Sequence, residues 1–140
     1  MGATGYHPAT GAIGAEGRYW DALIEGHLEL PRCRGCGTWH WPAVWRCGTC
    51  GSWDHGWIEC PLVGSVFSYT RTHHHFAGTE GLPSPFVSVL VLLSEAPIRL
   101  IGVLEGDEHD LRIGASVTGR IDRTRFGEAS IPALRWSLTR

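Results

Sequence analysis

Four cysteines carry the clearest chemistry in this sequence. Cys33, Cys36, Cys47 and Cys50 follow the spacing Cys-x2-Cys-x10-Cys-x2-Cys, and a glycine comes directly after the second cysteine of each pair. Such a glycine can adopt backbone angles that turn amide N–H groups toward the sulfurs. Four thiolates at the ends of two such turns form a closed tetrahedral Zn²⁺ site with no position for water. The spacing therefore predicts a structural zinc ion rather than a catalytic one.

The alternatives to zinc are two disulfides or four unrelated thiols. The first 17 residues contain neither a basic start nor a continuous apolar run, so no secretory signal is expected. No stretch approaches the roughly 18 apolar residues of a membrane span. We therefore expect a cytoplasmic protein, and in that compartment cysteine pairs hold metal more often than they form disulfides. A thioredoxin-like redox site is not expected, because the pairs do not follow a βαβ pattern.

Composition narrows the classes of function. The chain has 140 residues and a net charge of −2, which fits one compact domain or two very small ones and argues against a dedicated duplex-binding surface. All 12 basic residues are arginine, so lysine Schiff-base chemistry and a P-loop are excluded.

Tryptophan is concentrated in and beside the cysteine segment. Five of the seven tryptophans lie between positions 39 and 57: Trp39, Trp41, Trp45, Trp53 and Trp57. Some must cover the strands of the metal-binding segment, but five exceed that need, and tryptophan and arginine are enriched in protein interfaces. The candidate partner-binding residues are Trp20, Trp39, Trp41 and Trp45. Because Arg32, Arg34 and Arg46 flank the same segment, a single-stranded nucleic-acid platform is the alternative, although Asp54 and Glu59 dilute its charge.

The elements that position these residues divide the chain into four parts. Residues 1–15 are expected to form a flexible arm. Residues 16–30 are expected to form a helix that ends at Pro31, because Trp20, Ile24 and Leu28 recur at i, i+4 and i+8. A helix this short must dock, either on its own domain or on a partner, and the sequence leaves both open. Residues 31–60 are expected to form the zinc ribbon.

The residue pattern of 61–140 is typical of a β domain. Strands are predicted over 62–76, 86–95, 98–106, 115–124 and 131–138, with a bulge at Gly64 and a Gly/Pro loop at 77–85. Residues 86–95 are apolar on both faces, which predicts a strand that is covered on both sides. The predicted fold is mainly β: an N-terminal helix, a four-cysteine zinc ribbon and a five-stranded OB-fold barrel, which removes most edge strands.

Two further groups of residues are weaker candidates for chemistry. Cys60 is expected to be a small buried hydrophobic residue, with a reactive thiol as the less favoured alternative. His73, His74 and His75 would alternate faces in a strand and cannot converge on one metal, so a solvated strand end is favoured over a ligand-facing edge. No nucleophile elbow and no compelling carboxylate pair occur, so no catalytic residues are predicted.

The order of motifs resembles a known family. The segments YWDALIEGHLELPRC, CGTWHWP, CGTCGSWDHGWIE, GSVFSYT and PFVSVLVLL, followed by the IGASV turn, are similar to the acyl-CoA-associated OB-fold proteins with an N-terminal rubredoxin-like zinc ribbon, once known only as a domain of unknown function. The similarity spans about residues 18–138 and includes all four cysteines. Gly48 stands where many relatives have proline, and IPALRWSL matches the closing segment only loosely.

The resemblance implies a non-catalytic partner subunit. Such proteins are companions of thiolase-superfamily enzymes, including thiolases, acyltransferases and steroid side-chain aldolases, and some associate with hot-dog-fold hydratases. The expected function is therefore to bind and stabilise a thiolase-like enzyme in a hetero-oligomer that acts on acyl-CoA, with steroid or lipid degradation as candidate pathways. A single-stranded nucleic-acid-binding protein and a module that contacts acyl-CoA directly are the alternatives.

Overall fold

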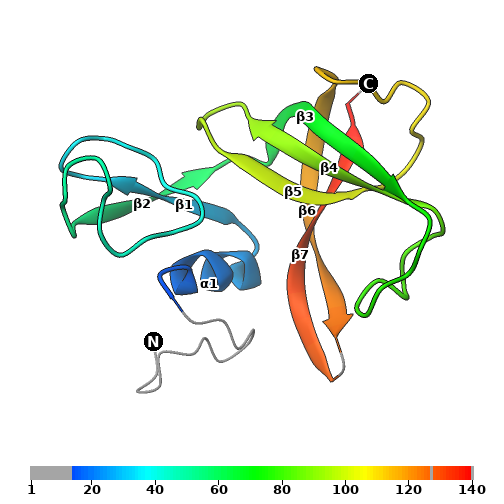
Figure 1. Ribbon diagram of the computed structural model, residues 1–140, viewed down its shortest axis with the longest axis horizontal. Coiled ribbons are helices and arrows are strands. Elements are labelled where there is room, and N and C mark those ends of the chain that lie inside the picture. Colours follow the sequence, from blue (N-terminus) through cyan, green and yellow to red (C-terminus); the bar gives the residue numbers. More distant parts are fainter. Residues whose placement is uncertain (1–13, 127, 140) are drawn as a thin grey trace. The chain divides into compact units, whose positions relative to one another are not determined.

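The chain forms two compact units, Met1–Pro61 and Leu62–Arg140 (Figure 1). The computed structural model describes residues 14–126 and 128–139. Of the flexible arm predicted for residues 1–15, residues 1–13 lie outside the described residues. No helix among those described is long and apolar enough to cross a membrane.

The first unit consists of a short helix and a two-stranded antiparallel ribbon. Helix α1 spans Gly17–Glu25, and strands β1 (Leu28–Cys33) and β2 (His55–Cys60) pair with each other. The segment between these strands carries the cysteines. The helix buries Tyr19, Ala22 and Leu23. Of the predicted stripe, Trp20 is half-buried and Ile24 is 40% exposed, so the buried face differs from the one that the sequence pattern predicted.

The predicted extent of the helix, residues 16–30, is wrong at its C-terminal end. Gly26 adopts a left-handed conformation (φ 98°) and its N–H donates to the carbonyl of Leu23, so the helix ends at Glu25 and not at Pro31. Leu28 and Leu30 are buried in β1 instead. Leu28 fits the helical repeat of the sequence, but pairing with β2 determines its structure, because tertiary contacts override local helical propensity.

The second unit is a closed five-stranded barrel, so the predicted fold class is confirmed. Its strands are β3 (Val63–Thr72), β4 (Phe86–Leu93), β5 (Arg99–Leu104), β6 (Ser116–Phe126) and β7 (Ala129–Leu138). They close in the order β3-β4-β5-β7-β6, and the parallel pair β5–β7 is formed at Val103↔Arg135 and Leu104↔Trp136. The first predicted strand, 62–76, ends earlier, at Thr72.

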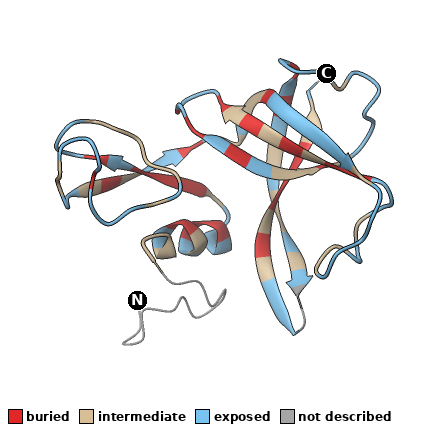
Figure 2. Cartoon of the chain, in the orientation of Figure 1, coloured by how far each residue is buried: buried red, intermediate tan, exposed pale blue. Residues whose placement is uncertain are grey.

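Trp136, in β7, is completely buried (Figure 2 shows the buried stretches in red). Two glycines make room for its ring. A Cβ on Gly102 would lie 2.7 Å from the Trp136 Cδ1 atom, and a Cβ on Gly119 would lie 2.7 Å from Cζ3. A side chain at either glycine would therefore collide with the largest residue of the core.

Two details of the predicted strands need correction. The register shift in β3 falls between Val66 and Ser68, so the bulge is not at Gly64. Gly64 is instead a point of close backbone approach, because a Cβ there would overlap the carbonyl oxygen of Leu92. Strand β4 alternates between fully buried and half-buried positions rather than being fully covered on both faces.

Candidate metal centre

The four predicted ligands meet at one end of the first unit. Cys33 ends β1, and Cys36, Cys47 and Cys50 lie in the segment that leads to β2. All four Sγ atoms lie within 4.8 Å of one another, with 3.5 Å between Cys33 and Cys50 and 3.7 Å between Cys36 and Cys47. Cys33 and Cys47 are buried, whereas Cys36 and Cys50 are exposed. Among the described residues this is the one group of three or more ligating side chains able to share an ion.

Each Cys-x-x-Cys pair forms a turn of the same construction. The glycines that follow the pairs, Gly37 and Gly51, have φ values of 79° and 80°, as the sequence pattern predicted, and each N–H donates to the carbonyl of the first cysteine at 2.9 Å. The arginine before each pair braces the turn from outside: Nε of Arg32 donates to the Gly37 carbonyl at 2.9 Å, and Nε of Arg46 donates to the Gly51 carbonyl at 3.0 Å. The repeated sequence Arg-Cys-x-x-Cys-Gly is the pattern that indicates these two arginine hydrogen bonds.

The thiols differ in acidity because their hydrogen bonds differ. The backbone N–H of Cys50 and the ring of His40 lower the pKa of Cys47 to about 5. The backbone N–H of Ser52 also favours the Cys50 thiolate, but hydrogen bonds with the other sulfurs and burial outweigh it and raise the pKa of Cys50 to about 12. Four thiolates this close repel one another, so a cation is needed to hold all four deprotonated.

A layer of histidines behind the cysteines is a part of the site that sequence reasoning missed. Nε2 of His40 lies 3.2 Å from the Sγ of Cys47. The His40 ring meets that of His55 edge to face, with centroids 5.6 Å apart, and Nε2 of His55 lies 3.0 Å from the carbonyl oxygen of Trp45. The position of His40 between the two cysteine pairs is the signal that could have pointed to it. Outer partners of this kind orient metal ligands and tune their basicity.

The donor set fits one metal ion of the thiolate-preferring class. Four sulfurs leave no ligand position for water, and backbone and side-chain donors surround them. An ion held in this way links the β1 end of the ribbon to both turns. The arrangement suits a structural centre that replaces a hydrophobic core.

The tryptophans proposed as partner contacts differ widely in exposure. Trp41 packs against Tyr19 with ring centroids 4.3 Å apart, and Trp20 meets the same tyrosine edge to face at 5.0 Å. The guanidinium of Arg32 lies over the Trp39 ring at 5.1 Å. These three side chains are therefore engaged within their own unit. Trp45 is 52% exposed.

Trp53, which was not among the four candidate contacts, is exposed still further, at 70%. Its position just outside the second cysteine turn was visible in the sequence. The sequence could not rank the tryptophans by exposure, because their burial depends on how α1 and the arginines pack over the ribbon.

The weaker candidates are not members of the cysteine cluster. Cys60 is buried, as expected, at the end of β2. His73, His74 and His75 are exposed and follow the end of β3 at Thr72. They are a solvated strand end, which was the favoured expectation.

Comparison with known proteins gives matches over both units. The family model described as ChsH2, rubredoxin-like zinc ribbon domain, matches residues 20–55, and that described as ChsH2, C-terminal OB-fold domain, matches residues 57–122. A protein of Thermomonospora curvata described as a probable enoyl-CoA hydratase alpha subunit is 33% identical over 108 residues, which cover 76% of this chain. The chain spans only 33% of that relative's length.

Two solved structures share the fold. A chain of a structure described as Ltp2-ChsH2(DUF35) aldolase is 30% identical, with a TM-score of 0.70, and the match covers 86% of this chain and 93% of that one. A protein of unknown function from the DUF35 family of Sulfolobus solfataricus is 20% identical, with a TM-score of 0.58 over 89% of this chain and 85% of that one. The second match bears on the fold alone.

Proposed function

This chain belongs to the ChsH2 family of proteins with a rubredoxin-like zinc ribbon and a C-terminal OB-fold, and we propose that it is a non-catalytic accessory subunit of an enzyme that acts on acyl-CoA. The partner that we propose is a thiolase-like subunit, as the family resemblance implies, and the assembly would be a hetero-oligomer. In this assignment the partner holds the reacting atoms, and this chain stabilises it.

The similarity to one chain of the Ltp2-ChsH2(DUF35) aldolase carries the proposal. It extends over nearly the whole of that chain at 30% identity, so both units of this chain have counterparts in a protein whose description names an aldolase. The hydratase name of the Thermomonospora curvata relative belongs to a longer protein, of which the match covers only 33%, so that activity is not transferred to this chain.

The experiment is co-purification of the chain from its native cells, followed by identification of the proteins bound to it. We expect a thiolase-superfamily subunit in a fixed ratio to this chain. Thiolase, aldolase and hydratase turnover should be absent from the purified chain alone, and turnover of the thiolase or aldolase class should appear in the reconstituted complex. Robust turnover by the chain alone would overturn the accessory role.

We also propose that the four cysteines bind one structural Zn²⁺. The support is the closed set of four sulfurs within 4.8 Å and the match of residues 20–55 to the zinc-ribbon model. Zinc accepts tetrahedral thiolate coordination without a redox change. Metal analysis of the purified chain should give one zinc per chain, and a chain that folds with no metal would contradict the assignment.

The ribbon surface around Trp45 and Trp53 is the partner contact that we propose. Both rings are more than half exposed, whereas the other candidate tryptophans are engaged within their own unit. Large aromatic side chains that become buried at an interface contribute a large part of its binding free energy. Trp45→Ala and Trp53→Ala should each weaken association by about tenfold or more. Phe76→Ala is the control, because Phe76 is 58% exposed in the other unit.

The nucleic-acid alternative is less favoured because several arginines are already paired. Arg34 contacts Asp54 at 2.7 Å, Arg71 contacts Glu108 at 2.8 Å and Arg120 contacts Glu105 at 2.6 Å. Phosphates would have to compete with these carboxylates. Titration with single-stranded DNA and RNA at two salt concentrations tests the alternative, since binding through phosphates weakens steeply with salt.

A further inference from the structure

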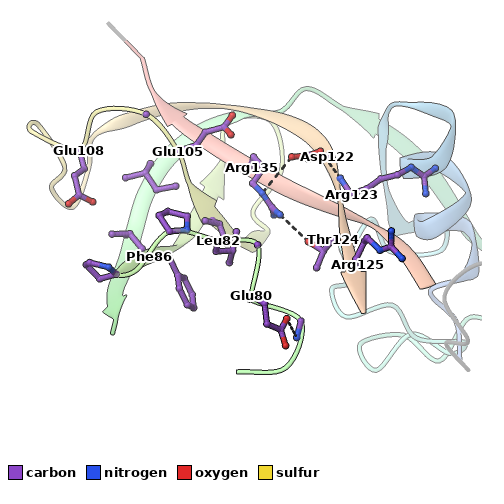
Figure 3. Close-up of a pocket in the computed structure, with 18 of the residues that line it drawn as sticks. Glu80, Leu82, Phe86, Glu105, Glu108, Asp122, Arg123, Thr124, Arg125 and Arg135 are labelled. Carbon is purple, nitrogen blue, oxygen red and sulfur yellow. Dashed lines mark hydrogen bonds and ion pairs between the residues drawn. The ribbon is translucent and has the colours of Figure 1, made fainter. Parts of the chain in front are cut away.

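The OB-fold unit contains a cavity that neither the metal centre nor the proposed partner surface uses. It has a volume of about 950 Å³, within the range of small-molecule sites, and lies between the loop before β4, the end of β5 and the β6–β7 pair (Figure 3). One wall is apolar and consists of Leu82, Pro83, Pro85, Phe86 and Val87. The opposite wall carries Thr124 and Arg135.

The carboxylates that line this cavity already have donors within the chain. Two of them accept from arginine side chains and two from backbone N–H groups, while Asp122 accepts from both kinds of donor. The pairs are Glu105 with Arg120, Glu108 with Arg71, Glu80 with the N–H of Gly78, Asp107 with the N–H of His109, and Asp122 with Arg120 and the N–H of Arg123. The acidic groups are therefore largely satisfied without a ligand.

Arg135 differs from the two other arginines that line the cavity, Arg123 and Arg125, because it is buried and they are exposed. The residue is 9% exposed, yet its hydrogen bonds go only to uncharged acceptors: Nη2 donates to Thr124 Oγ1 at 3.0 Å and Nη1 donates to the carbonyl of Leu134 at 3.3 Å. The nearest carboxylate oxygen paired with it, on Asp122, lies 3.9 Å from Nε and is shared with Arg120. A guanidinium has five N–H donors, and a buried cation without a close counter-ion is costly.

We propose that this cavity binds an amphipathic monocarboxylate, with its carboxylate on Arg135 and Thr124 and its apolar body against the Leu82–Phe86 wall. The planar guanidinium matches the geometry of a carboxylate. Glu105 and Asp122 lie close to the anchor, so they disfavour a doubly charged phosphate more than a singly charged carboxylate. This site does not depend on the proposed metal or on the proposed partner.

Hexanoate is the probe, and ligand-observed saturation-transfer NMR with backbone amide shifts of the ¹⁵N-labelled full chain is the measurement. Hexanoate should bind and shift amides of the 78–87 loop and of β6–β7. Hexanamide, which lacks the charge, acetate, which lacks the apolar body, and hexyl phosphate, which carries a second charge, should each bind at least about tenfold more weakly. Equal affinity for hexanoate and hexanamide would overturn the anion anchor, and no binding of hexanoate would overturn the site.

Variants test the anchor itself. Arg135→Met should weaken hexanoate binding by about tenfold or more, and Thr124→Val by a smaller factor. Arg112→Gln is the control, because Arg112 is an exposed arginine of the same unit that does not line the cavity. If Arg135→Met does not fold, the Thr124→Val variant and the comparison of hexanoate with hexanamide on the unaltered chain decide the question. Unchanged hexanoate affinity in a folded Arg135→Met variant would refute the proposal.

Discussion

Replacing Cys47 with serine should remove the metal, whereas the same change at Cys60 should not. Both residues are buried in the first unit, with exposures of 2% and 4%, so both variants place a hydroxyl at a buried position in that unit. They differ in position: Cys47 lies in the four-sulfur cluster and Cys60 lies outside it. The difference between the two variants therefore isolates the contribution of the metal.

The expected difference in zinc-binding free energy between the two variants follows from the four-ligand geometry. Structural zinc binding is worth about 10–16 kcal/mol in small zinc peptides, so an equal share for one of four thiolates is about 3 kcal/mol. This corresponds to a loss of affinity of roughly a hundredfold or more. Because the ion links both turns to β1, the first unit should lose its near-UV circular dichroism in Cys47→Ser.

The assay is metal content after gel filtration, followed by competition with a chromophoric chelator and by thermal unfolding. Cys60→Ser should retain one zinc per chain and resist the chelator as the parent chain does. Cys47→Ser should lose zinc and the unfolding transition of the first unit, while the transition of the barrel remains. Equal zinc retention by the two variants would refute the four-cysteine assignment.

Three further predictions concern single side chains. His40→Phe should release zinc to a chelator about tenfold faster than His40→Gln, because only glutamine keeps an N–H donor for the Cys47 sulfur; equal release rates would contradict this role. Gly64→Ala should lower the free energy of unfolding by about 2 kcal/mol or more, measured by urea denaturation, because its methyl group would overlap a backbone oxygen of β4; Gly81→Ala, which meets nothing within 4 Å, should change it by less than about 0.5 kcal/mol. The hydrogen bond from Arg120 lowers the pKa of Glu105. This ion pair therefore stabilises the barrel above the unfolded-state pKa of glutamate, about 4.3, and the stabilisation is lost as the pH falls through the lower folded-state pKa. Glu105→Gln should therefore lower the melting temperature of the barrel more at pH 7 than at pH 3, and an equal loss at both would exclude the ion pair as the cause.

The two cysteine turns and the conformations of their glycines could be predicted from the sequence, because they depend only on neighbouring residues. Each Cys-x-x-Cys-Gly turn forms within five residues, and the left-handed conformations of Gly37 and Gly51 follow from the turn itself. The barrel was predictable for a related reason: five β-rich segments with Gly/Pro connections leave few other solutions.

The helix boundary shows where local patterns fail. Leu28 satisfies a helical repeat and also a strand alternation with Leu30, and only the pairing of β1 with β2 selects the second. The bulge in β3 was misplaced for the same reason. A glycine permits a bulge, but the register between two strands decides where it occurs.

By itself, the sequence identified the four cysteines that the fold brings together, the turns that present them and the class of fold, because these depend on spacing and on residue types within short segments. Only the tertiary structure decided that His40 reaches the Cys47 sulfur, that Trp45 and Trp53 remain exposed, and that Arg135 is buried beside a cavity. Each of these depends on how side chains pack in the folded chain and on which segments lie beside them. A one-dimensional pattern does not specify such contacts.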